Sequence, residues 1–139
     1  MTRRHFDGTG WEADAGYARA VRRGSRIAVS GTTAHGDDGV LHPGDTYGQT
    51  TVALHRALHA VRALDGDHES VVRSRLYLAP DADWRAAARA HAEVLGAVSP
   101  ANTTLFVHAL VGDGFLVEVE LEAELEAELD SEPGGGDGA

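Results

Sequence analysis

The chain has 139 residues, a length that suits one globular domain with a core of its own. Its formal charge is −10, from 22 acidic and 12 basic residues, which argues against nucleic acid as a partner. All basic residues other than histidine are arginines and no cysteine is present, which excludes a lysine Schiff base, a cysteine nucleophile and a thiolate metal site.

The opening residues, MTRRHFDGTGW, carry charges without an apolar run behind them, so they do not read as a signal peptide. No stretch of the sequence approaches the length of a membrane span. We therefore expect a cytoplasmic protein that has no membrane partner.

The first half of the chain is predicted to contain a hairpin, a loop and a long helix. A turn at 22–25 precedes a short strand at 26–30. Residues 35–47 hold seven turn formers and are expected to form a loop. From Thr46 to Leu64, apolar residues recur at three- and four-residue spacings, which is typical of a helix.

The second half continues with a strand, a helix and two further strands. Residues 70–78 favour a strand, and Asp81 or Asp83 can cap the helix that follows. The segment SPANTTLF is expected to be a loop that leads into a strand at 105–111. A Gly-Asp-Gly turn would then join that strand to a partner at 115–121, which closes the fold as a hairpin.

The last part of the chain is strongly acidic. In ELEAELEAEL, strand and helix periodicities both fit, and we expect a strand to about residue 123 followed by a helical or frayed extension. Residues 130–139 are expected to be a disordered tail beyond a single domain at 1–129.

This order of elements predicts an α+β fold, in which both helices pack on one face of a sheet. The other face would leave apolar surface in water, so we expect self-association.

Several segments, in this order, carry a resemblance to a known family. They are GYARAVRRGSRIAVSG at 16–31, YGQTTVAL, VVRSRLYL, DADWRAAARAHAEVLG, SPANTTLF and FLVEVELEA. Over about residues 6–123 the chain resembles the Rid family, the reactive intermediate deaminases of the YjgF group. The resemblance implies a chorismate-mutase-like fold, a homotrimer, and a cleft for a small molecule between adjacent subunits.

The resemblance also assigns candidate site residues. Family members that hydrolyse 2-imino or enamine acids carry an arginine for the substrate carboxylate at the position of Asn102. They carry a glutamate that orients or activates water at the position of Glu118. The residues that match other cleft positions are Tyr17, Ser30, Gly31 and Thr104.

The presence of Asn102 where these family members carry an arginine changes the ligand that we expect. An arginine can bind a carboxylate through two charge-assisted hydrogen bonds, whereas a neutral hydrogen bond contributes about 0.5–1.5 kcal/mol net. Affinity for 2-imino acids should therefore be low, and the loop indicates a neutral or differently charged ligand.

Each candidate also has a structural interpretation. Glu118 could be one more glutamate of an acidic strand, and Asn102 could bond its own loop backbone. His108 is a weak cleft candidate that could equally face solvent. His55 and His59 stand one helical turn apart, as zinc ligands can, but a solvated helix face is the favoured interpretation.

The leading functional hypothesis is a trimeric enzyme that hydrolyses or tautomerises a reactive imine, enamine or related carbonyl compound without a mandatory carboxylate. Neither a metal nor an organic cofactor is expected. The alternative is a Rid-fold module that binds a metabolite without turnover. A third possibility is a 2-imino acid deaminase in which a neighbouring subunit supplies an arginine.

Overall fold

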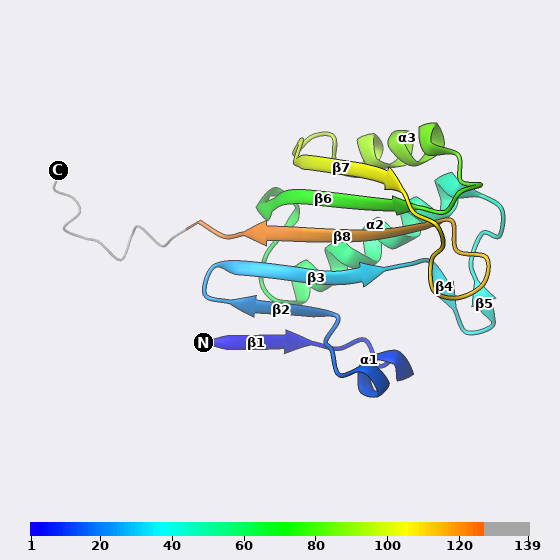
Figure 1. Ribbon diagram of the computed structural model, residues 1–139. Helices are drawn as coiled ribbons and strands as arrows, with labels where there is room; N and C mark the ends of the chain where they lie inside the picture. Colours follow the sequence, from blue (N-terminus) through cyan, green and yellow to red (C-terminus); the bar gives the residue numbers. More distant parts are fainter. Residues whose placement is uncertain (127–139) are drawn as a thin grey trace, which may run out of the picture.

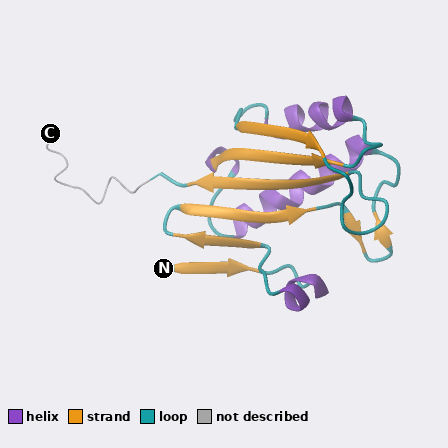
Figure 2. Cartoon of the chain, viewed as in Figure 1, coloured by secondary structure: helices purple, strands orange, loops and turns teal. Residues whose placement is uncertain are grey.

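The computed structural model describes residues 1–126 and shows a six-stranded mixed β-sheet, covered by helices on one face, and a small two-stranded sheet (Figures 1 and 2). The strand order is β1-β2-β3-β8-β6-β7, in which only the β6–β7 pair is parallel. The sheet strands are β1 (Thr2–His5), β2 (Ala20–Arg23), β3 (Arg26–Thr32), β6 (Val71–Leu78), β7 (Ala101–Phe106) and β8 (Val117–Glu124). This confirms the predicted α+β class.

Two long helices supply the covering layer. They are α2 (Thr46–Ala63) and α3 (Trp84–Leu95), and α2 packs on β3, β8 and α3. Asp45 caps α2 through the backbone N–H of Gly48, whereas Asp83, rather than Asp81, caps α3. The remaining short elements are α1 (Gly10–Ala15), β4 (His35–Gly36), β5 (Gly39–Val40) and the 3₁₀ turn η1 (His68–Ser70).

The C-terminal part differs from the sequence prediction. The strand expected at 105–111 instead spans Ala101–Phe106, so Asn102 lies inside a strand rather than in a loop. The prediction of a closing hairpin is also wrong. The strand β7 pairs in parallel with β6, while β8 lies between β3 and β6. A parallel pair needs a crossover, and α3 provides it.

Two N-terminal elements were not predicted from the sequence. These are β1, which pairs with β2 at the edge of the sheet, and the short helix α1. The acidic tail predicted at 130–139 lies outside the described residues, as do residues 127–129. Within residues 1–126, no helix combines the length and hydropathy of a membrane span.

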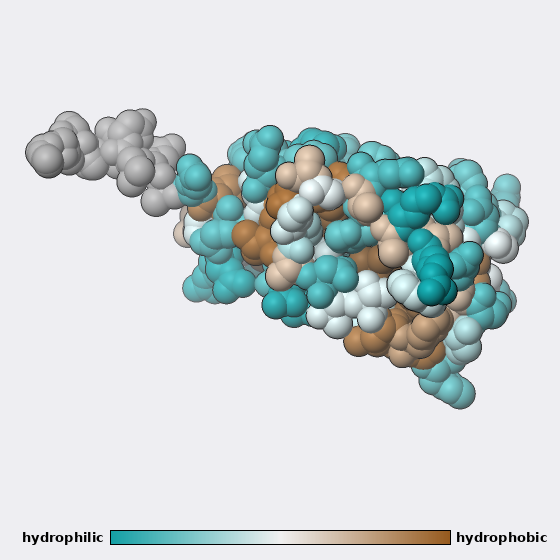
Figure 3. Space-filling view, turned by 90° about the horizontal axis from the view of Figure 1, so that it is seen from above, coloured by the Kyte–Doolittle hydropathy of each residue, from teal (hydrophilic) through white to brown (hydrophobic). Residues whose placement is uncertain are grey.

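The uncovered face of the sheet is more polar than we expected. Arg75 contacts Glu122 at 2.9 Å and Glu120 at 3.5 Å, and the Tyr77 hydroxyl donates to Glu120 at 2.8 Å. Exposed apolar side chains instead include Phe106 on β7, which is 51% exposed. Viewed from the β7 side, apolar patches interrupt the hydrophilic surface (Figure 3). Apolar surface is therefore exposed at the β7 edge.

Candidate functional site

A cavity of about 630 Å³ opens where α1, β3 and β8 meet. Its floor includes Ser30 and Gly31 of β3 and Glu118 of β8, and Tyr17 lies at its wall. These are four of the seven residues that the sequence singled out as site candidates. The cavity is large enough for a small organic molecule.

A bulge in β3 brings the backbone of the strand against the Glu118 carboxylate. The β3–β8 register shifts between Val29 and Thr32. A Cβ atom built on Gly31 would overlap Glu118 Oε2 and lie 2.9 Å from its Cδ. Only glycine therefore leaves room for the carboxylate at this point, which gives Gly31 a steric role.

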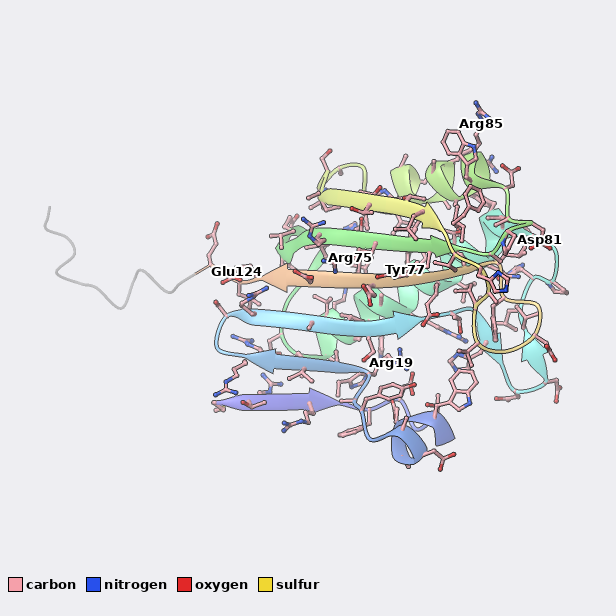
Figure 4. The ribbon with its side chains drawn as sticks, viewed as in Figure 1. Arg19, Arg75, Tyr77, Asp81, Arg85 and Glu124 are labelled. Atoms are coloured by element: carbon pink, nitrogen blue, oxygen red, sulfur yellow. The ribbon has the colours of Figure 1, made fainter. Side chains whose placement is uncertain are left out.

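A buried arginine holds this bulge in place. Arg19 is only 5% exposed, and its Nη1 donates to the Gly31 carbonyl at 2.6 Å and to Thr32 Oγ1 at 3.0 Å. Its Nε lies 3.2 Å from Asp7 Oδ2 and 3.8 Å from Glu12 Oε2. Arg19 lies beside α1 and thus ties the helix to the bulge (Figure 4).

Ser30 also has a structural contact. Its hydroxyl donates to the Ala18 carbonyl at 2.7 Å, and its backbone N–H donates to the Arg19 carbonyl. The side chain therefore fixes the chain just after Tyr17 and so contributes to the shape of the cavity wall. The Tyr17 ring in turn lies 5.7 Å from the Arg19 guanidinium carbon.

The environment of Glu118 favours its protonated form more than water would. Burial raises the pKa of Glu118, and the charge of Glu120 raises it further, while the charge of Arg19 lowers it. No hydrogen bond from within residues 1–126 stabilises the ionised carboxylate. A half-buried carboxylate with a raised pKa is a stronger base than a solvated one and can accept and return a proton.

Asn102 and Thr104 lie apart from this cavity, on β7, with β6 between them and β8. Asn102 Nδ2 donates to Ser74 Oγ at 3.0 Å, and Thr104 donates to Asn102 Oδ1 at 3.0 Å. Ser74 Oγ also hydrogen-bonds His91 of α3 at 2.7 Å, so the Asn102 amide lies on the helix-covered side of the sheet. The Asn102 side chain therefore bonds the neighbouring strand β6. The interpretation that it bonds its own loop backbone is wrong.

Glu118 lies on the other side of the sheet. It is two residues from Glu120, whose carboxylate meets Tyr77 and Arg75 over the uncovered face (Figure 4). Within one chain, Asn102 and Glu118 therefore do not converge on a common ligand.

The histidine candidates also lie outside the cavity. His108 is exposed in the segment that follows β7 and does not line the cavity. His55 and His59 are exposed on α2, as the solvated-face interpretation expected. Among residues 1–126, no group of three or more histidine, aspartate and glutamate side chains is arranged to hold a metal ion.

Sequence reasoning missed Trp11, Arg19 and His35 as parts of the site. All three line the cavity, and the rings of Trp11 and His35 lie 5.7 Å apart. Arg19 carried a weak signal, because it lies between Ala18 and Ala20, two small apolar residues that precede and begin a strand. Trp11 carried none, since its helix was not predicted.

Replacement of Gly31 by alanine tests whether the bulge positions the carboxylate. The new methyl group must displace the Glu118 side chain or the bulge, and a shift of about 1 Å can cost roughly 100-fold in turnover. The free energy of unfolding should change less, because the atoms that the methyl group meets belong to the flexible Glu118 side chain.

Gly10→Ala is the matched control for this change, because a Cβ at Gly10 meets nothing within 4 Å. Turnover and thermal unfolding of both variants should be measured side by side. Equal behaviour of the two variants would show that Gly31 does not position Glu118.

Comparison with known proteins agrees with the family suggested by the sequence. The sequence model described as Endoribonuclease L-PSP matches residues 9–125. Uncharacterized protein SCO2049 of Streptomyces coelicolor is 42% identical over 120 residues, which cover 86% of this chain and 90% of that protein.

Solved structures show the same relationship. Rv2704 of Mycobacterium tuberculosis, a member of the YjgF/YER057c/UK114 family, is 34% identical with a TM-score of 0.81, over 90% of this chain and 100% of that one. PA3499 of Pseudomonas aeruginosa is 27% identical with a TM-score of 0.78, over 93% and 96% of the two chains. The chain therefore belongs to the Endoribonuclease L-PSP family, which is the YjgF or Rid family.

Proposed function

We propose that this protein is an enzyme that hydrolyses or tautomerises a small imine or enamine that need not carry a carboxylate. The observation that carries the proposal is Glu118, a half-buried carboxylate with a raised pKa, held over Gly31 in a cavity of about 630 Å³. Its position in the family's motif supports the same role. Glu118 is the proposed catalytic residue, and Gly31 with Tyr17 shapes the site around it.

The proposed hydrolysis of a protonated imine proceeds in two stages, in which Glu118 first takes up a proton and then returns it. In the first stage, Glu118 takes a proton from water while the water oxygen bonds to the imine carbon, which gives a neutral carbinolamine. In the second stage, the Glu118 carboxyl returns that proton to nitrogen, the C–N bond breaks, and the leaving ammonia takes up the hydroxyl proton as the carbonyl forms. The products are a carbonyl compound and ammonium, and Glu118 is ionised again.

The charges of the cavity disfavour a 2-imino acid as the substrate. Arg19 is the arginine that lines the cavity; its Nη1 donates to the Gly31 carbonyl and its Nε faces Asp7 and Glu12, so within residues 1–126 only its Nη2 is without a partner. A substrate carboxylate would therefore find only Nη2 rather than a complete free guanidinium, and it would meet the negative charge of Glu118. An RNA phosphodiester would meet the same charge, which disfavours ribonuclease activity despite the family's description.

We further propose a homotrimer with the chorismate-mutase-like arrangement. Asn102 and Glu118 occupy opposite sides of the sheet in one chain, so a ligand that touches both needs a second chain. The exposed β7 edge, which carries Asn102 and Thr104, is suited to lie against the cavity of a neighbour. In that arrangement Asn102 and Thr104 would orient the ligand.

The experiment for the proposed function is hydrolysis of benzaldimine, an imine without a carboxylate. The imine is generated from benzylamine by an amine oxidase, and benzaldehyde formation is followed by its absorbance. We expect wild-type protein to accelerate hydrolysis over the spontaneous rate with saturation kinetics. Saturable binding that raises the melting temperature without any acceleration would instead identify a binding module.

An arginine at position 102 tests the proposed assembly. If β7 of one chain borders the cavity of another, Asn102→Arg should restore a carboxylate clamp and raise kcat/KM for 2-iminopropionate by about tenfold or more. Thr103→Arg is the matched control, because residue 103 points to the other face of the same exposed strand. An equal effect of both arginines, or none, would count against the inter-subunit cleft, and sedimentation would show whether the trimer persists.

A further inference from the structure

The cavity carries an excess of negative charge. Asp14, Glu118 and Glu120 all line it, and Asp14 is exposed and forms no ion pair within residues 1–126. The positive charge of Arg19 is offset by Asp7 at 3.2 Å and Glu12 at 3.8 Å. A ligand therefore meets carboxylates whose charge the cavity itself does not balance.

A second cation near the cavity is also engaged. Arg75 binds Glu122 at 2.9 Å and reaches Glu120 only at 3.5 Å. The imidazole of His35 adds little positive charge, because burial and the charge of Arg56 lower its pKa and keep it neutral near pH 7. The negative excess consequently persists at neutral pH.

Aromatic rings line the same cavity. Trp11 is 47% exposed, and its ring lies 5.7 Å from that of His35 at an interplanar angle of 54°. Tyr17 stands on the wall nearby. Aromatic faces combined with carboxylates are the arrangement by which proteins recognise organic cations.

We propose that the cavity selects a positively charged organic ligand, a protonated imine or amine on a small apolar or aromatic frame. This inference rests on the proposed function and specifies the substrate class of the same site. The aromatic rings contact the apolar frame, and the carboxylates of Asp14 and Glu118 face the positive nitrogen. Protonation also makes the imine carbon more electrophilic, so the charge that is recognised is the charge that prepares the carbon for water.

The test uses three unreactive probes of similar size that differ in charge. They are benzyltrimethylammonium, benzyl alcohol and benzoate, titrated into full-length protein at low ionic strength. Of the two tryptophans in the chain, Trp84 lies on α3 outside the cavity, so a Trp84→Phe background makes Trp11 the fluorescent reporter. We expect the ammonium to bind at least about tenfold more tightly than the alcohol and benzoate to bind most weakly. Added salt should weaken the binding of the ammonium probe but not that of the other two probes.

Asp14→Asn separates charge recognition from simple apolar binding. It should weaken binding of the ammonium severalfold and leave binding of the alcohol unchanged. Asp38→Asn is the matched control, because Asp38 is exposed and lies outside the cavity. Equal loss of ammonium binding in both variants would mean that only the overall charge of the protein matters.

Two outcomes distinguish this inference from the proposed function. Tighter binding of benzoate than of the ammonium, or no selective binding, would overturn the cationic ligand, while benzaldimine turnover could still stand. Tight, Asp14-dependent binding of the ammonium without any imine turnover would support the cationic site and refute the enzyme.

Discussion

Replacement of Glu118 by glutamine is expected to reduce imine hydrolysis by a factor of roughly 10²–10⁴, the usual contribution of a general acid or base. Glutamine keeps the size and most of the contacts of the side chain, so the cavity over Gly31 should persist. The loss should appear in kcat, because the carboxylate acts on water rather than on the ligand frame. Benzaldimine kinetics of the two proteins, corrected for the spontaneous rate, measure it directly.

The same substitution, which should lower activity, is not expected to lower stability at neutral pH. The pKa of Glu118 is raised in the folded protein, so the folded state binds more protons than the unfolded state between the two pKa values. The contribution of Glu118 to stability is thus present at low pH and lost as pH rises through its folded pKa. Near neutral pH, Glu118→Gln should be at least as stable as wild type, and this advantage should shrink on acidification.

This combination separates catalysis from structure. A variant that is inactive and equally stable identifies a functional carboxylate, whereas a variant that is inactive because it unfolds does not. Activity of the wild type should also fall as pH drops through the raised pKa of Glu118, because the ionised form takes the proton from water. A rate unchanged by Glu118→Gln would sink the mechanism.

Replacement of Arg19 by glutamine is expected to lower the free energy of unfolding by about 3–5 kcal/mol, the usual cost of breaking a buried ion pair on one side. Arg19 and Glu12 are each only 5% exposed, so the change leaves the buried Glu12 carboxylate with the backbone N–H groups of Asp7 and Gly8 but without its cation. It also removes the donor to the Gly31 carbonyl, so the bulge under Glu118 loses its anchor. Chemical denaturation measures the first effect and imine turnover the second.

Two further variants make the Arg19 result specific. Arg23→Gln is the matched control, because Arg23 is exposed at the end of β2, and its change should stay within about 0.5 kcal/mol. Adding Glu12→Gln to the Arg19 variant removes the buried charge but also one of the two acceptors for the backbone N–H groups of Asp7 and Gly8, so the two changes should not be additive. A loss below about 1 kcal/mol for Arg19→Gln would contradict the anchoring role.

The elements with strong local signals were predictable. Apolar spacing located α2 to within a residue, one of the two proposed caps, Asp83, begins α3, and a stretch rich in Val, Leu and Tyr located β6. The pairing of β7 could not be predicted. The segment SPANTTLF and the residues after it satisfy strand propensity over several registers, and only α3 directs the chain back parallel to β6. Non-local pairing of this kind leaves no local trace.

The site divides in the same way. Family motifs located Glu118 and Gly31, and the structure supplies the physical reason, a glycine that leaves room for a carboxylate. The contribution of Trp11 could not be predicted, since it depends on how α1 folds back along β3. The pattern also placed Asn102 beside Glu118, although their side chains lie on opposite sides of one sheet. Proximity in a family cleft is a property of the proposed assembly rather than of one chain.

The most direct test of a cleft without a carboxylate requirement is a comparison of two substrates with wild-type protein. Benzaldimine and 2-iminopropionate, each freshly generated, should be compared by kcat/KM under one set of conditions at neutral pH. The account predicts a preference for benzaldimine of about tenfold or more, because the cavity offers carboxylates and aromatic rings instead of a free arginine. A preference for 2-iminopropionate would contradict it and would mean that a cation, Arg19 or one from a neighbouring chain, binds the carboxylate.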